Sequence, residues 1–304
     1  MFAARDRLPH VDRPAPLLQP HATLRTGGRR FAFMTEFCDL ARLSAIVWGW
    51  ELKAFFRRPS GYVLLLGAAL TACWSFSWLV TLLSRGQSIA LRAVDDPIAQ
   101  FLGPNLFLIG GCSLLVPLLS MNTIADERRS GRWEHFATAP ISPLAIVLGK
   151  FAATWCLLLT CLVPWLYYLV VLRWWNGSIT TIGPGLDFDF GPVLAGCVGL
   201  AAVGTTFVAI GLVCSALCRR PASAALLSFL AMGLLLLIGM APRMLEYWGF
   251  PPESIRFVSA LSCWGHVERF SRGVIEPPLI AGHLTVAAIL IWSAAAACRR
   301  GDDN

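Results

Sequence analysis

Six long runs of apolar residues alternate with more polar stretches along the chain. A helix needs roughly 20 apolar residues to cross a 30 Å hydrocarbon layer, and each run meets that length. Apart from Lys150, near the start of the third run, no charged residue lies within the runs. The pattern predicts an all-α membrane protein with six transmembrane helices, at about residues 61–83, 104–124, 144–172, 191–217, 222–241 and 279–298.

Composition supports the same class of protein. Of the 304 residues, 56% are apolar and only 14% are charged, whereas soluble domains average roughly 25% charged residues. This number of charged side chains is too small to cover the surface of a water-soluble protein of this length. Lipid must therefore solvate much of the surface. The net charge of +7 then bears first on membrane topology and anionic headgroups, and we expect no nucleic-acid partner.

The segments before and after the spans are polar. Residues 1–35 are rich in Arg and Pro and predict a disordered tail, although Met34 is an alternative start of the protein. Residues 36–58 combine Trp and Phe with basic side chains, which predicts an amphipathic helix in the membrane interface. Residues 36–298 therefore predict one transmembrane domain, followed by a short tail, 299–304.

Basic residues set the expected orientation. With the N-terminus in the cytosol, 18 of the 25 Lys and Arg residues fall on the cytosolic side. Because cytoplasmic loops carry the excess of Lys and Arg, both termini are expected in the cytosol of a multi-pass inner (plasma) membrane protein.

The loop 125–143 is the most informative cytosolic stretch, with the sequence ADERRSGRWEHFATAPISP. Gly131 permits a sharp turn, and Trp133 and Phe136 can share one face of a short helix. Such a helix, held between two spans, suits docking into a groove of a partner protein. The alternative is a solvated loop that Trp133 anchors at the headgroups.

The region 242–278, on the other side of the membrane, contains partly apolar stretches that predict short helices. His266, Glu268 and Arg269 lie together there. One His and one Glu are too few ligands for a metal site, so these residues are interpreted as surface polar groups at the membrane edge.

Several kinds of chemistry are excluded by motif. The chain has two lysines, Lys53 and Lys150, and neither follows the glycine-rich pattern of a phosphate-binding loop. We therefore expect no ATPase site, catalytic residue, cofactor or metal in this chain. Without an ionisable group at mid-membrane, energy for any transport would come from outside the bilayer.

Four stretches resemble the ABC-2 family of ABC permeases. The segment ADERRSGRWEHFATAPISPLAIVLGKF is similar to the family's loop E-R-R-S-G-T-x-E-x-L-x-T-A-P-x-S and the LGKF that follows it. LSCWGHVERFSRGVIE is similar to L-S-x-x-x-H-F-x-x-F-x-x-G-V-x-D. The other two stretches are ELKAFFRRPSGYV and GPVLAGCVGLAAVGTTFVAIGLVCSALCRRPASAA. The likeness covers residues 48–298 and is closest to the gliding-motility and nitrous-oxide-reductase-associated branch, with departures at Arg132, Phe136 and Glu276.

The resemblance implies a permease subunit of an exporter, paired with a second permease subunit and driven by separate ABC ATPase subunits. The residues expected at the ATPase interface are Glu127, Arg129, Trp133, Glu134 and Phe136. The rival interpretation is a membrane scaffold that anchors a partner complex without transporting anything.

Overall fold

The computed structural model describes residues 27–85, 101–133, 142–178 and 190–300, and its secondary structure is helical. Residues 1–39 and 40–304 form separate compact units. The described part of the first unit opens helix α1 (Gly27–Arg57). Residues 27–35, assigned above to a disordered tail, are helical in the structure; they follow the last proline of the tail, Pro20. The remainder of the predicted tail lies outside the described residues.

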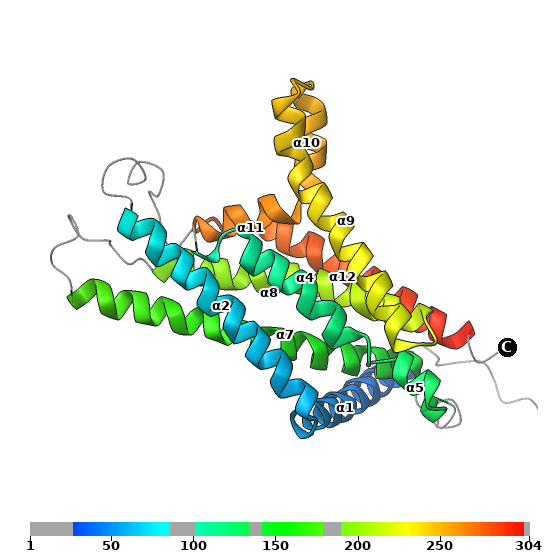
Figure 1. The fold of residues 1–304 in the computed structure, drawn as a ribbon. Coiled ribbons are helices and arrows are strands. Elements are labelled where there is room, and N and C mark those ends of the chain that lie inside the picture. Colours follow the sequence, from blue (N-terminus) through cyan, green and yellow to red (C-terminus); the bar gives the residue numbers. More distant parts are fainter. Residues whose placement is uncertain (1–26, 86–100, 134–141, 179–189, 301–304) are drawn as a thin grey trace, which may run out of the picture. The chain divides into compact units, whose positions relative to one another are not determined.

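Six apolar helical stretches within the described residues are long enough to cross a membrane. Four of them begin at a proline, which suits the first turn of a helix because its N–H group has no partner there. The predicted all-α membrane protein with six spans is thus confirmed. The spans are α2 (Pro59–Arg85), the stretch Phe107–Arg129 with α4 (Leu106–Ser120) and α5 (Ala125–Arg129), α7 (Pro143–Ser178), α8 (Phe190–Leu217), α9 (Pro221–Tyr247) and α12 (Pro277–Arg300) (Figure 1).

Helix α8 is the central span. Of its most apolar window, 72% is buried, against 22% for α2 and α9, and α8 contacts α4, α7, α9, α11 and α12. Glycines permit these close contacts. A Cβ at Gly199 would lie 2.4 Å from Phe270, and one at Gly211 would lie 2.5 Å from Ser120 Oγ. At both positions the glycine serves packing within one chain.

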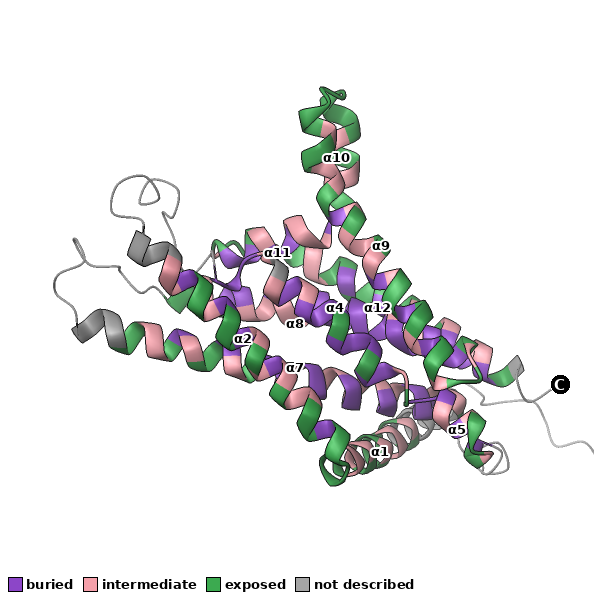
Figure 2. Ribbon diagram, in the orientation of Figure 1, coloured by how far each residue is buried: buried purple, intermediate pink, exposed green. Residues whose placement is uncertain are grey.

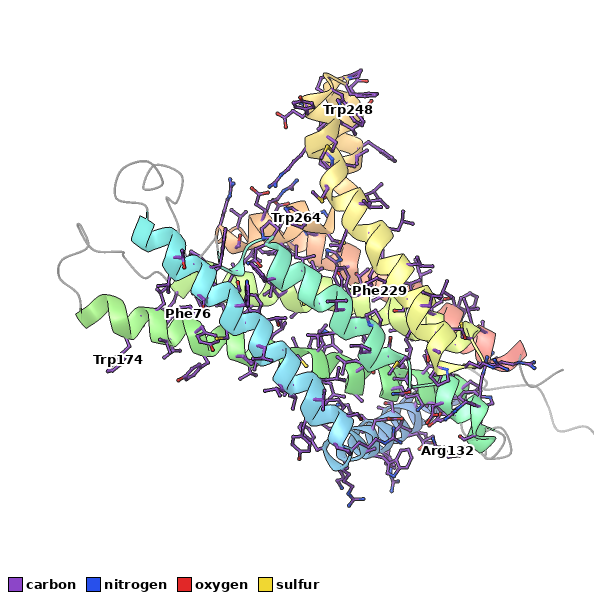
Figure 3. All side chains as sticks on the ribbon, in the orientation of Figure 1. Phe76, Arg132, Trp174, Phe229, Trp248 and Trp264 are labelled. Carbon is purple, nitrogen blue, oxygen red and sulfur yellow. The ribbon has the colours of Figure 1, made fainter. Side chains whose placement is uncertain are left out.

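The outward faces of α2 and α9 are apolar and exposed, as lipid contact requires (Figure 2). Leu66 and Leu70 on α2 are about as exposed as Leu230 and Leu234 on α9. Aromatic residues mark the ends of two spans: Trp174 near the end of α7 and Trp248 just after α9 are both exposed (Figure 3). Tryptophan is enriched at membrane–water interfaces, so these positions agree with the span assignment.

Two short helices follow α9, as the sequence predicted for the segment between the fifth and sixth spans. Helix α10 (Pro252–Leu261) packs against α9 and has no buried residue, whereas α11 (Cys263–Ser271) packs against α8 and α9 and buries His266 and Phe270. His266 is therefore not a surface group, and that interpretation was wrong.

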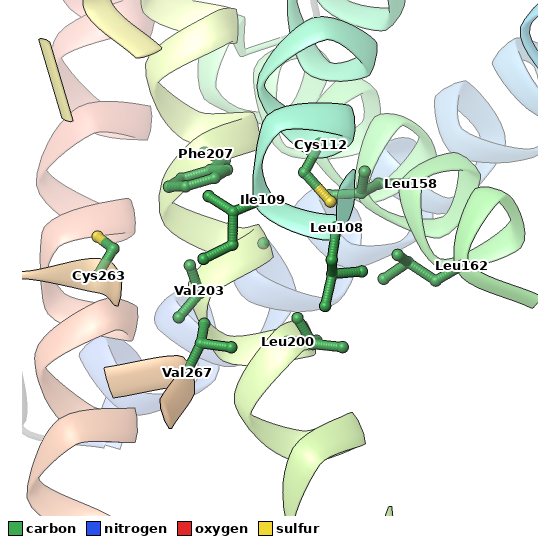
Figure 4. A pocket seen from close by; sticks show the side chains of 11 residues that line it. Leu108, Ile109, Cys112, Leu158, Leu162, Leu200, Val203, Phe207, Cys263 and Val267 are labelled. Atoms are coloured by element: carbon green, nitrogen blue, oxygen red, sulfur yellow. The ribbon is translucent and has the colours of Figure 1, made fainter. Parts of the chain in front are cut away.

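The helix core contains a small apolar cavity of about 20 Å³, lined by residues of α4, α7, α8 and α11 such as Leu108, Leu158 and Val203 (Figure 4). A single water needs at least roughly 10–15 Å³ and several polar partners, and the lining offers almost none. This cavity cannot serve as a passage for a solute.

Candidate coupling site

Helix α5 is attached to α8 through one hydroxyl group. Ser215 Oγ accepts hydrogen bonds from the backbone N–H groups of Ile124 (3.2 Å) and Ala125 (3.1 Å), and Thr123 Oγ1 lies 3.3 Å from it. No side chain at the N-cap position of α5 makes a capping bond. A neighbouring span therefore supplies the acceptor that the first turn of a helix needs.

Arg128 connects the same helix to the ends of two spans. Its guanidinium donates to the carbonyl oxygens of Ala216, in the last turn of α8, and of Ala297 (3.2 Å), in the last turn of α12. Carbonyls in the last turn of a helix have no partner within that helix, and a cation there also suits the helix dipole. The guanidinium carbon lies 5.6 Å from the centre of the Trp133 ring, which adds a cation–π contact.

A buried ion-pair cluster centres on Lys150. Its ammonium group is paired with Glu51 on α1 and with Glu127 on α5, at 2.8 Å from Glu127 Oε1, and it donates to the carbonyl oxygen of Thr123 at 2.8 Å. The Lys150 side chain is 1% exposed. Removing an ammonium group from water is costly unless partners surround it, and here all three of its N–H donors have an acceptor.

The cluster carries two carboxylates and one ammonium group. Its formal charge is therefore negative, and Glu127 Oε2 is buried with no hydrogen-bond partner in the described part of the chain. The arrangement binds three helices to one another, and in the described residues no group of three or more His, Cys, Asp or Glu side chains is placed to hold a metal ion.

Close packing fixes the position of α1 beside Lys150. A Cβ at Gly149 would lie 2.6 Å from the Ser44 carbonyl oxygen and 2.7 Å from Val47 Cβ, so α1 and α7 nearly touch there. Leu52 and Phe55 on α1 also pack against the main apolar core. The part of α1 after residue 40 is thus held against the spans by apolar contacts and by the Glu51 ion pair.

The five residues expected at a partner interface have different environments. Arg129 is exposed, whereas Glu127 and Trp133 are buried against neighbouring helices. Glu134 and Phe136 lie outside the described residues. Trp133 follows Gly131, whose φ of 71° allows the turn that the sequence predicted, and it belongs to a second apolar cluster with Ile124 and Ile146.

Exposed charge gathers at the free side of α5. Asp126 forms ion pairs with Arg129 (3.3 Å) and Arg132 (3.1 Å), whose side chains are 66% and 45% exposed. Arg132 lies just beyond α5 (Figure 3). The element therefore has an inner side that attaches it to the spans and an outer side that carries exposed basic groups paired with Asp126.

Sequence reasoning missed the residues that attach α5. Arg128, Ser215 and the pairing of Glu51 with Lys150 had no place among the predicted interface residues. A signal was present, since Lys150 is the one charge within the apolar runs and a buried charge needs a partner.

Comparison with protein families gives one match. Residues 85–261, more than half of the chain, match the family model described as ABC-2 family transporter protein. No curated protein matches the chain.

Proposed function

Because the chain belongs to the ABC-2 family of transporter proteins, we propose that it is the membrane-spanning permease subunit of an exporter. ATP would be hydrolysed by a separate ABC ATPase subunit that docks on the segment around α5. The sequence motifs favour the branch of gliding-motility and nitrous-oxide-reductase-associated permeases.

The observation that carries the proposal is the attachment of α5. Its bonds reach α1 and α7 through Lys150, α8 through Ser215, and α8 and α12 through Arg128. A force applied to so short a helix would therefore be transmitted to four longer helices. This is the mechanical requirement for a permease whose energy comes from another chain.

We assign two roles among the five interface residues. Arg129, which is exposed, would contact the ATPase, and we retain Glu134 and Phe136 as predicted contacts. Glu127 and Trp133 hold the docking segment against the spans. We propose that α5, at the end of its span, lies on the cytosolic side with both chain termini, as the distribution of basic residues favours.

The transport pathway would lie between two permease subunits, identical or different. The cavity within the core of one chain is apolar and holds about 20 Å³, so it cannot pass a solute. A groove of about 340 Å³ lies instead between α2, α4 and α9, bordered by Gly110, Gly111 and Gly233. We propose that the partner subunit packs on this face, because the resemblance implies a dimer and this groove is larger than the core cavity.

Charge reversal at Arg129 tests the ATPase contact. The permease would be co-expressed with a candidate ABC ATPase subunit. Arg129→Glu should weaken the association measured by co-purification by about thirtyfold in Kd, the equivalent of about 2 kcal/mol. ATPase stimulation should fall in parallel while the amount of inserted permease stays constant. Arg256→Glu on α10 reverses another exposed arginine and should change neither quantity.

Unchanged association and stimulation in Arg129→Glu would refute the docking surface. An intact complex that hydrolyses ATP without moving any solute across a vesicle membrane would favour the scaffold interpretation instead.

A further inference from the structure

A buried histidine pair joins α11 to the second turn of α12 and, through Thr206, to the middle of α8. His266 on α11 and His283 on α12 are 7% and 6% exposed. His266 Nδ1 lies 3.1 Å from His283 Nε2, and His283 Nδ1 lies 2.9 Å from Thr206 Oγ1 on α8. Three helices thus meet through one chain of hydrogen bonds. Along α8, Thr206 at the pair and Ser215 beside α5 are about 14 Å apart at 1.5 Å per residue.

Helix α11 is held against three spans. Phe270 fills the space left by Gly199 on α8, Ser262 Oγ donates to the Gly239 carbonyl on α9 at 3.1 Å, and His266 reaches His283 on α12. Of these three contacts, only the one between His266 and His283 contains side chains that can gain a proton between pH 5 and 8. The other two contacts carry no group that titrates in that range, so a pH response of the docking must come from the histidines.

The bond between the rings requires neutral imidazoles or a single shared proton. In the neutral pair one ring nitrogen donates and the facing nitrogen accepts. One added proton can still be shared, but it brings a positive charge into a buried site. A second proton would set two N–H groups facing each other and break the bond. Each protonation therefore favours separation of α11 from α12.

The surroundings do not stabilise that charge. Burial lowers the pKa of His266 below its ordinary value of 6.5, and Arg269 lowers it further, against opposing effects of the Ala260 carbonyl and Glu276. Nε2 of His266 is buried and has no hydrogen-bond partner among the described residues.

The other charged groups near α11 are already paired. Glu268 pairs with Arg272 (2.7 Å) and with Arg243 of α9 (3.7 Å), and Glu276 pairs with Arg269 (3.1 Å). From α8 and α12 the facing polar groups are Thr206 and His283 themselves.

We propose that His266 and His283 form a proton-sensitive latch that holds α11 against α8 and α12 at neutral pH and releases it on acidification. A histidine whose pKa is lowered in the docked form binds its proton more tightly in the undocked form, so undocking becomes more favourable as the pH falls below 6.5. The latch does not depend on the proposed transport function. Its consequence for transport does, since α11 would then control the side of the permease away from the ATPase.

Hydrogen–deuterium exchange of the purified full chain in phosphatidylcholine nanodiscs tests the latch. After correction for the intrinsic effect of pH, backbone exchange of residues 263–271 should speed up about tenfold between pH 7.5 and 5.5, the change expected for one histidine that titrates only when undocked. Exchange of the α5 region should stay constant.

Two variants identify the titrating groups. In the double variant His266→Asn and His283→Gln, the amides lie near the positions of Nδ1 and Nε2, so a bond can remain without titration, and the pH response should vanish. Glu276→Gln removes a carboxylate beside Arg269 and should keep the response. A change below twofold in the natural sequence would overturn the latch. So would an unaltered response in the double variant, or its loss in Glu276→Gln.

Discussion

Replacing Lys150 by Met removes the centre of the buried ion-pair cluster while keeping a side chain of similar length. Glu127, with a side chain 5% exposed, and Glu51, 22% exposed, would then face each other without a cation. Breaking a buried ion pair by removing one partner costs about 3–5 kcal/mol, because the remaining charge is left uncompensated. At about 2 °C per kcal/mol for a chain of this size, the unfolding temperature should fall by about 6–10 °C.

The charge balance of the cluster provides a matched control. Glu127→Gln leaves Lys150 paired with Glu51 and bonded to the Thr123 carbonyl, and it makes the cluster formally neutral. We therefore expect a loss below about 1 kcal/mol, in the range of one ordinary hydrogen bond. Adding Glu127→Gln to Lys150→Met should recover part of the loss, because one uncompensated carboxylate is removed.

The assay is thermal unfolding of the detergent-solubilised protein, followed by the loss of the monodisperse peak in size-exclusion chromatography. If Lys150→Met unfolds within 2 °C of the natural sequence, the cluster does not hold the helices together. If Glu127→Gln is the more damaging change, the reasoning from charge balance is wrong.

The same assay tests two further contacts. Ser215→Ala leaves two buried N–H groups at the start of α5 without an acceptor and should cost about 1–3 kcal/mol of stability. The control, Ser223→Ala at an exposed position, should have almost no effect. Equal shifts of the unfolding temperature in the two variants would contradict the role of Ser215 as a cap. Gly199→Ala places a Cβ 2.4 Å from Phe270 and should destabilise the protein by about 1–3 kcal/mol through overpacking. As a control, the Cβ of Gly67→Ala in α2 meets nothing within 4 Å, so this variant should be neutral or slightly more stable. A neutral Gly199→Ala would mean that α11 can move away from α8 at little cost.

The sequence by itself determined the spans and most of their boundaries. Each span must be apolar over its own length, because lipid offers no partner to polar groups, so the rule applies to each segment separately. The prolines at positions 59, 143, 221 and 277 begin four of the spans for a reason that is equally local. The turn at Gly131 likewise needs only its own backbone conformation. These features could be predicted without knowing what packs against what.

Only the tertiary structure decided which polar side chains meet. Glu51 and Lys150 are 99 positions apart, and neither segment alone indicates the other as its partner. The sequence predicted Trp133 as an exposed docking residue, yet Ile124, Ile146 and the Arg128 guanidinium pack against it. His266 looked like a surface group until α12 brought His283 to within 3.1 Å of it. In each case the environment depends on how separate helices pack, and a pattern along one helix does not contain that information.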